Sequence, residues 1–273
     1  MNDRFASKYG PWALVTGASE GLGAEFARQI AARGVNVVLV ARTAAKLEQR
    51  AAEIEREFHV STRVVPLDLA RDDFLPELLA AIDGLEIGLL VSNAGISTVG
   101  PFLDREPDYL LRQLYVNTRA ALVLTRHLGE QMVGRHRGGV ILLSSGSALH
   151  GTPWSANYAG TKAYNLMLAE ALWYEWKPLG VDVLGFMAGA TRTSGWAANG
   201  PQRSLIVPVM DAAPTVAVAL RSLGRHPSAT PGHVNRLGYW FMGMLPRALA
   251  VRMLGNQMRT IFGPFDGVPK VAP

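Results

Sequence analysis

Cysteine is absent from the 273 residues of this chain. Its absence excludes a disulfide framework, a thiolate metal site and catalysis by a thiol. The six histidines lack the H-E-x-x-H spacing and every other common metal-ligand spacing. We therefore expect no bound metal, and we expect surface or loop positions for His59, His127, His136, His150, His226 and His233.

Long apolar runs are also missing. The best candidate, Leu237 to Leu245, stops at Pro246 and Arg247, whereas a membrane-spanning helix needs about 20 apolar residues. The segment from Met1 to Tyr9 is polar and charged and lacks the apolar core of a secretory signal. The sequence therefore predicts a cytoplasmic protein.

Charged residues are few, at 18% of the chain, and 49% of the residues are hydrophobic. This balance is ordinary for a globular protein and unlike that of a disordered one. The formal net charge is +5, but the basic residues are spread along the chain and form no tract. A mildly basic surface attracts phosphate-bearing ligands, and without a tract we expect no nucleic-acid partner.

Apolar, β-branched runs alternate with amphipathic stretches through the first two thirds of the chain. Uninterrupted apolar strands separated by helices are typical of a parallel sheet covered on both faces. The predicted strands are Trp12–Thr16, Asn36–Ala41, Thr62–Leu67, Gly88–Ser92, Gly139–Ser144 and Val181–Met187. The predicted helices are Gly21–Arg33, Ala44–Phe58, Pro107–Val133, Asn157–Lys177 and Ala212–Leu223.

The fold class that follows is α/β, with a Rossmann-type, doubly wound parallel sheet. We find no linker, internal repeat or second core, so we predict a single domain over 1–273. About 10–188 would form the cofactor-binding and catalytic core. About 189–262 would supply a substrate loop and C-terminal helices that cover the substrate.

The turn between the first strand and the first helix, TGASEGLG, contains Gly17, Gly21 and Gly23. Glycines at this place let the backbone approach a pyrophosphate closely, and the helix N-terminus offers free N–H groups to the phosphates. The same glycines also suit an ordinary tight loop, so this segment alone does not establish that the chain binds a dinucleotide.

The second strand ends at Ala41-Arg42-Thr43. Dinucleotide-binding folds place an acidic residue here to hold a free ribose 2′-hydroxyl, whereas an arginine accommodates a 2′-phosphate. Arg42, with Lys46 nearby, therefore favours NADP (NADPH) over NAD. Glu20, inside the glycine loop, works against this preference because it adds negative charge near the phosphates. The alternative is that Arg42 is only a solvated residue at a strand end.

Tyr158 and Lys162 lie four residues apart near the start of a predicted helix, so they share one helical face. A free tyrosine has a pKa of about 10, and a nearby ammonium stabilises its phenolate form. Ser144 and Ser145 end the fifth strand, at the sheet edge where ligands bind. A serine hydroxyl there could stabilise charge that develops on a substrate carbonyl oxygen.

Asparagine marks two further positions. Asn93-Ala94-Gly95 ends the fourth strand at the same sheet edge, and Asn117 lies inside an apolar helical stretch. Asparagine is disfavoured in a helix interior, so Asn117 predicts a helix distortion or a bound water.

Together these residues identify the chain as similar to the short-chain dehydrogenase/reductase family. TGASEGLG, Leu67-Asp68, SNAG at 92–95, Asn117, Ser145 and YAGTK occur in the family's order between Thr16 and about Thr193. The opening KYGPWALVTGASEGLG and NVVLVARTAAKLE look most like the branch of the 3-ketoacyl-CoA reductases and 17β-hydroxysteroid dehydrogenase type 12. That branch prefers NADPH.

The resemblance implies a seven-stranded sheet, with a seventh strand within 225–240, and a homodimer or homotetramer. It implies that Tyr158 is the acid/base, that Ser145 orients the carbonyl, and that Asn117 anchors a water in a proton relay. Lys162 would hold the nicotinamide ribose and tune the tyrosine. The implied cofactor-binding residues are Gly17, Ser19, Glu20, Gly21, Leu22, Gly23, Arg42, Asp68, Leu69, Asn93, Ala94, Gly95, Tyr158, Lys162, Gly189, Thr191 and Thr193.

The chain departs from the family pattern after the sixth strand. Ala188-Gly189 stands where the family usually has Pro-Gly, which predicts a looser loop over the nicotinamide.

Residues 190–262 contain apolar and aromatic side chains, including Trp196, Met210 and Tyr239 to Met244. They predict a hydrophobic substrate such as an acyl chain, a steroid-like ring or an aromatic ketone, although they also suit an ordinary core or a subunit interface. The stretch from Tyr239 to Phe262 mixes apolar clusters with arginines. We interpret it as a lid or subunit contact and leave open a weak peripheral contact with a membrane.

Two other classes of function remain. Gly17-Ala18-Ser19-Glu20-Gly21 also spells the G-x-S-x-G elbow of serine hydrolases, but no earlier strand loop supplies the oxyanion-hole donors. A catalytically silent NADP-binding sensor or scaffold would also bind the dinucleotide, although such proteins usually lack part of the Ser–Tyr–Lys set that this chain has in full.

Overall fold

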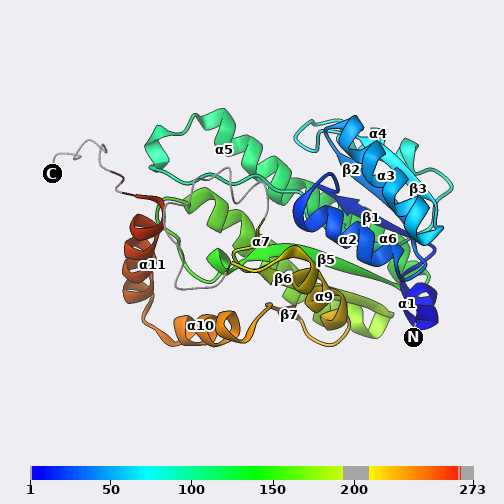
Figure 1. Cartoon of the computed structure of the whole chain (residues 1–273). Helices are drawn as coiled ribbons and strands as arrows, with labels where there is room; N and C mark the ends of the chain where they lie inside the picture. Colours follow the sequence, from blue (N-terminus) through cyan, green and yellow to red (C-terminus); the bar gives the residue numbers. More distant parts are fainter. Residues whose placement is uncertain (1, 193–208, 264, 266–273) are drawn as a thin grey trace.

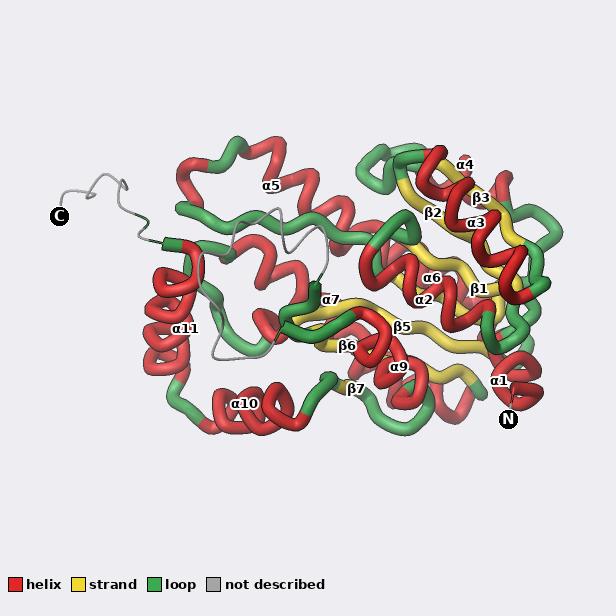
Figure 2. Tube along the Cα trace, in the orientation of Figure 1, coloured by secondary structure: helices red, strands yellow, loops and turns green. Residues whose placement is uncertain are grey.

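The computed structural model describes residues 2–192, 209–263 and 265. All seven strands pair in parallel in a single sheet, in the order β3-β2-β1-β4-β5-β6-β7 (Figures 1 and 2). The strands are β1 Trp12–Thr16, β2 Asn36–Ala41, β3 Thr62–Pro66, β4 Ile87–Ser92, β5 Gly138–Ser145, β6 Val181–Ala188 and β7 Ser228–Ala229. The predicted fold class is confirmed, and the seventh strand lies within the expected range.

Helices cover both faces of the sheet (Figure 1). The helices that pack on the sheet are α2 Gly21–Ala31, α3 Ala44–Phe58, α4 Phe74–Ala81, α6 Ala120–Gly134, α7 Ala156–Trp176 and α9 Ala212–Ser222. One apolar cluster joins the sheet to α2, α3 and α9, and another joins it to α4, α6 and α7. Strands such as β4 and β5 are buried along nearly their whole length. This two-sided burial explains why they are uninterrupted apolar runs.

The strand order reverses between β1 and β4, which are neighbours in the sheet although β2 and β3 separate them in the chain. The connections that follow β1 and β4 therefore leave in opposite directions. In such sheets this leaves a crevice at the carboxyl ends of the strands, where ligands bind.

The long helix predicted over Pro107–Val133 is interrupted. It consists of α5 Pro107–Leu114, a π-helical turn Tyr115–Arg119, and α6. Asn117 lies inside the π-helical turn and is buried. The expected helix distortion at this asparagine is therefore confirmed, and π turns are often found at functional sites.

The sequence did not predict α1 Asn2–Tyr9 or α4. Tyr9, at the end of α1, is buried and donates a 2.8 Å hydrogen bond to Asp182 at the start of β6. Lys8 pairs with the same carboxylate. Helix α1 therefore closes the amino edge of the sheet, opposite the crevice.

Helices α10 His233–Met244 and α11 Arg247–Phe262 follow β7 and lie beyond the carboxyl edge of the sheet (Figure 1). Neither helix is a membrane-spanning helix. In the described part of the chain, no helix is long and apolar enough to cross a bilayer.

Candidate active site

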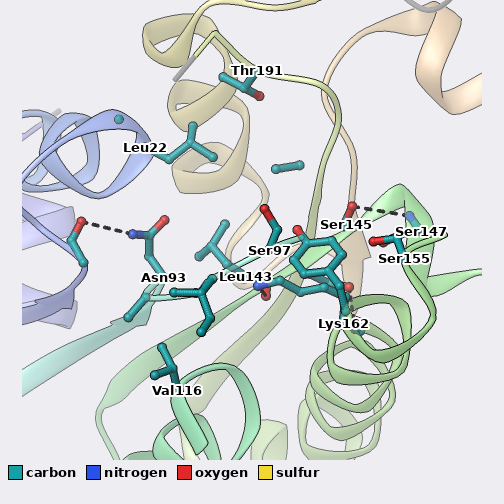
Figure 3. A pocket seen from close by; sticks show the side chains of 18 of the residues that line it. Leu22, Asn93, Ser97, Val116, Leu143, Ser145, Ser147, Ser155, Lys162 and Thr191 are labelled. Atoms are coloured by element: carbon teal, nitrogen blue, oxygen red, sulfur yellow. Dashed lines mark hydrogen bonds between the residues drawn. The ribbon is translucent and has the colours of Figure 1, made fainter. Parts of the chain in front are cut away.

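A cavity of about 630 Å³ runs along the carboxyl edge of the sheet. The glycine loop lines one end, the ends of β4 and β5 line the middle, and α7, α10 and α11 line the other end. Figure 3 shows Leu22 and Asn93 on one side of this cavity and Ser145 and Ser155 on the other, with Lys162 extending toward the middle.

The glycine loop needs its glycines for close backbone approach. Gly17 has a φ of +68°, and a Cβ there would lie 2.8 Å from Nδ2 of Asn93. A Cβ on Gly23 would lie 2.1 Å from the carbonyl oxygen of Gly17. Helix α2 starts after Glu20 with no side-chain cap. Its first N–H groups can therefore serve an anion such as a pyrophosphate.

Asn93 ties the glycine loop to the end of β4. Its Nδ2 donates to the carbonyl oxygen of Thr16 at 2.9 Å, and the hydroxyl of Thr16 accepts hydrogen bonds from the N–H groups of Asn93 and Ala94, both at 3.0 Å. Asn93 thus lines the cavity as predicted, while its amide fixes the shape of the loop.

The end of the cavity at the glycine loop carries several charged groups. Asp68 accepts hydrogen bonds from Arg112 at 2.6 Å and from the N–H of Ala70 at 3.0 Å. Burial raises the pKa of the Asp68 carboxyl, but the hydrogen bonds from Arg112 and Ala70, together with the charges of Arg112 and Arg42, bring it below its usual value. Asp68 is therefore ionised at neutral pH. Sequence analysis missed Arg112, because nothing in the local pattern of α5 points to a role at this place.

Glu20 and Lys46 form an ion pair at 2.7 Å. The pair compensates the negative charge that Glu20 adds to the loop. Lys46 lines the cavity beside Arg42 but is paired with Glu20, whereas Arg42 is exposed and has no carboxylate within ion-pairing distance among the described residues.

Ser145, Tyr158 and Lys162 meet in the middle of the cavity. The Nζ atom of Lys162 lies 5.6 Å from the centroid of the Tyr158 ring and donates a 3.0 Å hydrogen bond to the carbonyl oxygen of Leu143. Burial lowers the pKa of Lys162 to about 8. Burial raises the pKa of the Tyr158 phenol above its ordinary value, and a hydrogen bond with Ser145 opposes part of this rise.

The expected lowering of the Tyr158 pKa by Lys162 is therefore not found. At neutral pH the phenol is protonated, so it can donate a proton to a carbonyl oxygen. The serine hydroxyl next to it can hold that oxygen in place.

Asn117 lies behind this cluster and does not line the cavity. Its Oδ1 accepts a hydrogen bond from the N–H of Ile96 at 2.8 Å, and its Nδ2 donates to the carbonyl oxygen of Ile96 and to the hydroxyl of Thr161, both at 3.0 Å. Nδ2 of Asn165 donates a 2.9 Å hydrogen bond to the backbone carbonyl oxygen of Asn117. Sequence analysis missed Asn165, which lies one helical turn after Lys162.

The loop after β6 is held at two points within the described residues. The N–H of Met210 donates to Ala190 at 2.8 Å, and the N–H of Arg192 donates to Met210 at 2.9 Å. Gly189 packs against Asn235, since a Cβ on it would lie 2.6 Å from Nδ2 of Asn235. These contacts fix the path of 189–192, and the looser loop expected from the missing proline stays a prediction. The predicted residue Thr193 lies outside the described residues.

The other predicted cofactor-binding residues line the cavity, except Gly23, which packs under the loop. The residues present fit a dinucleotide, because one continuous cavity joins a glycine loop without room for side chains to the Ser–Tyr–Lys cluster.

Comparisons with known proteins agree with this geometry. Residues 11–204 match the family described as short chain dehydrogenase. The chain belongs to this family. A very-long-chain 3-oxoacyl-CoA reductase-like protein of Arabidopsis thaliana is 35% identical over 246 residues, which are 88% of this chain and 78% of that protein. A 7β-hydroxysteroid dehydrogenase of Collinsella aerofaciens is 32% identical over 233 residues, which are 84% of this chain and 89% of that protein.

This short-chain dehydrogenase is also similar in structure to two solved proteins. A structure of a 7β-hydroxysteroid dehydrogenase has a TM-score of 0.86 and 29% identity, with 92% of this chain and 98% of that chain covered. A short-chain dehydrogenase of Sphingobium yanoikuyae in complex with NADPH has a TM-score of 0.74 and 28% identity, with 88% and 98% covered. The protein is thus an oxidoreductase of a family that acts on CH–OH and C=O groups, and it resembles the 3-oxoacyl-CoA reductase branch.

The substrate side of this dehydrogenase differs from the sequence expectation. Of the residues from Tyr239 to Met244, only Tyr239 lines the cavity, while Trp240, Phe241, Met244 and also Met253 are exposed. Trp196 lies outside the described residues. The apolar wall comes instead from α11, through Leu254, Met258, Ile261 and Phe262.

No described residue that lines the cavity is a histidine. Ser19 therefore lacks the base that a hydrolase needs, and the nucleophile-elbow interpretation of the glycine loop has no structural support. The described residues also contain no cluster of three or more histidine, aspartate or glutamate side chains that could hold a metal.

Proposed function

We propose that this short-chain dehydrogenase is an NADPH-dependent reductase that converts a ketone on a hydrophobic substrate to a secondary alcohol. The observation that carries the proposal is the meeting of Ser145, Tyr158 and Lys162 in the cavity that the glycine loop also lines.

The roles follow from the state of each group. The protonated phenol of Tyr158 gives its proton to the substrate carbonyl oxygen, and Ser145 donates a hydrogen bond that orients this oxygen. NADPH, when bound, would supply the hydride for the carbonyl carbon. Lys162 would hold the ribose hydroxyls of this cofactor, and its ammonium favours proton release from Tyr158 because it stabilises the phenolate that forms.

Asn117 is a positioning residue in this scheme. Its side chain holds the segment after β4 at Ile96 and the first turns of α7 at Thr161. We propose that a water at this place returns a proton to Tyr158 after each turnover, as the family resemblance implies.

The preference for NADP rests on Arg42. Its guanidinium is exposed in the cavity, and the nearby negative charge of Glu20 is compensated by Lys46. A guanidinium suits a phosphate because it can donate two parallel hydrogen bonds. The Sphingobium yanoikuyae relative was solved with NADPH, which supports the same choice.

A hydrophobic substrate suits the apolar wall that α11 places opposite the catalytic cluster. Acyl chains and steroid rings are the two classes that the relatives' names point to.

A homodimer or homotetramer is the proposed assembly. Exposed apolar residues gather on α5, the π-helical turn, α6 and α7, including Leu111, Leu114, Leu122, Tyr164 and Met167. Such a patch is typical of a protein interface. Size-exclusion chromatography with light scattering tests it, and a monomer at all concentrations would contradict it.

The outer face of α10 and α11 also carries exposed apolar residues, among them Leu237, Trp240, Phe241 and Met244. Every charged residue from 233 to 262 is an arginine. We propose that the protein is cytoplasmic and touches anionic membranes weakly through that face. Co-sedimentation with phosphatidylserine vesicles should exceed that with phosphatidylcholine vesicles; equal co-sedimentation would contradict this contact.

The decisive experiment is a panel of ketones and secondary alcohols with purified protein, followed by nicotinamide absorbance. We expect NADPH oxidation with long-chain or ring ketones. Binding of NADPH without turnover of any substrate would favour a silent NADP-binding sensor or scaffold.

A further inference from the structure

Tyr239 of α10 brings a second phenol to the reaction centre. A Cβ placed on Gly146 would lie 2.0 Å from the Tyr239 hydroxyl oxygen. This hydroxyl therefore lies against the residue that directly follows Ser145. Tyr239 and Tyr158 line the same cavity.

The position of Tyr239 is fixed from the start of its helix. Asn235, one helical turn earlier, is buried and donates a 2.9 Å hydrogen bond to the carbonyl oxygen of Pro231. Its amide also packs against Gly189, in the loop that follows β6. Helix α10 is thus anchored beside the catalytic cluster.

The Tyr239 hydroxyl has no hydrogen-bond partner within the described part of the chain. Burial, aided by the charge of Tyr158, raises its pKa to about 12. It therefore remains a protonated donor at working pH, in a cavity whose remaining wall on α11 is mostly apolar.

We propose that Tyr239 is a specificity-determining residue whose hydroxyl donates a hydrogen bond to a second carbonyl oxygen of the substrate, close to the ketone that is reduced. The inference rests on the proposed ketone reduction and narrows its substrate class. A 3-oxoacyl thioester has such a neighbouring carbonyl, whereas a simple ketone has none.

The test compares kcat/KM for a 3-oxoacyl N-acetylcysteamine thioester with that for a simple ketone of the same chain length. Tyr239→Phe should lower the value for the thioester roughly tenfold, the scale of one lost hydrogen bond, and leave the value for the simple ketone unchanged. Tyr174→Phe, at an exposed position on α7, is the matched control and should change neither.

An equal fall for both substrates would show a structural role and overturn the inference, as would no fall for either. A wild-type enzyme that reduces simple ketones but not the thioester would also overturn it. A wild-type enzyme that reduces no ketone would instead contradict the proposed function.

A different observation carries a second inference. A cavity of about 350 Å³ lies between the end of α9, β7 and the start of α10. Five of its lining residues are basic, namely Arg221, Arg225, His226, His233 and Arg236, and no lining residue is acidic.

Several arginines of the described chain have no carboxylate partner, and three of them converge on this basic pocket. Elsewhere on the surface Arg28, Arg50, Arg71, Arg112, Arg119 and Arg126 each pair with a carboxylate. Among the described residues, Arg221, Arg225 and Arg236 have no carboxylate within 4.0 Å. Since like charges that converge without counterions repel one another, the pocket is suited to a bound anion.

We infer that the basic pocket binds phosphate groups, which guanidinium groups recognise through two parallel hydrogen bonds. The phosphates could belong to the phosphorylated carrier of a thioester substrate or to a free phosphate ligand. The start of α10 lines the pocket, and Tyr239 follows His233 by six residues, or about 9 Å of helix rise.

The two sources separate in one set of measurements on Arg221→Gln/Arg225→Gln. A carrier predicts that KM rises roughly tenfold for a coenzyme A thioester and stays unchanged for the same acyl group on N-acetylcysteamine. A free ligand predicts that calorimetry detects inorganic phosphate bound to the wild type and not to the variant, with both KM values unchanged. Arg56→Gln, at an exposed position on α3, is the control. If neither effect occurs, the pocket is not a phosphate site.

Discussion

The ammonium group of Lys162 is buried, lies 5.6 Å from the centre of the Tyr158 ring, and donates a 3.0 Å hydrogen bond to the carbonyl oxygen of Leu143. Burial of this charge costs folding free energy, but it puts the ammonium within reach of the ribose of a bound cofactor and of the Tyr158 phenol.

Replacing Lys162 should raise stability while it removes activity. Burial lowers the pKa of Lys162 from 10.5 to about 8, which corresponds to at most about 3 kcal/mol of unfavourable charge burial. Lys162→Met removes that charge and keeps a side chain of similar length. Thermal unfolding at pH 7 should shift upward by several degrees, and NADPH-dependent turnover should vanish. A lower midpoint would contradict this account.

The stability gain should depend on pH. Between about pH 8 and 10.5 the unfolded wild-type chain binds a proton at Lys162 that the folded chain has lost. Wild-type stability therefore rises with pH through this window. The advantage of Lys162→Met should be full below pH 8 and shrink toward pH 10. Denaturant unfolding at pH 7 and pH 10 measures it.

The activity of the wild type should fall with rising pH, whereas its stability rises. The charged form of Lys162 is the one that holds the ribose and acts on the phenol, and it is lost as pH rises through about 8 in the free enzyme. Tyr158 stays protonated, because its pKa is raised above the ordinary value of 10.0. We expect kcat/KM for ketone reduction to be flat below pH 7 and to fall above pH 8. A rate that increases steadily to pH 10 would be inconsistent with this.

Arg42 should decide the choice of cofactor. Arg42→Asp removes the guanidinium from the 2′-phosphate position and adds a carboxylate that suits a free 2′-hydroxyl. Loss of hydrogen bonds to a charged group costs about 1.5–3 kcal/mol, so kcat/KM for NADPH should fall roughly 10- to 100-fold, while that for NADH rises or stays. Arg56→Asp, on the exposed surface of α3, should change neither. An unchanged NADPH preference in Arg42→Asp would refute the assignment.

The sheet could be predicted from the sequence because its strands are buried on both faces. Trp12–Thr16 and Asn36–Ala41 have the predicted bounds. β5 is one residue longer than predicted at each end, and β6 is one residue longer at its C-terminal end. The helix distortion at Asn117 was also predictable, because a polar residue inside an apolar helix needs a hydrogen-bond partner. Asn117 lies in a π-helical turn.

The remaining features depend on contacts between distant segments. Helix α4 was missed because FLPELLAA has apolar residues on all sides and a proline inside, which hides the helical pattern. The contact of Arg112 with Asp68 spans 44 residues. The apolar residues of α10 and α11 gave no sign of which face would turn inward, so Trp240 and Phe241 were assigned to the substrate although they are exposed.

The raised pKa of Tyr158 could not be predicted either. The spacing of Tyr158 and Lys162 indicates one shared face, but burial raises the pKa of the Tyr158 phenol and lowers that of the Lys162 ammonium. The pattern alone gives the neighbours and not the dielectric environment.

The most direct test is the redox rate of Tyr158→Phe with saturating NADPH and a ketone that the wild type reduces. Loss of the only proton donor assigned to the carbonyl oxygen should lower kcat by about 100- to 10,000-fold, while NADPH binding, followed by fluorescence, stays within a few-fold of wild type. A variant that keeps the wild-type rate would contradict the central claim that this phenol transfers the proton.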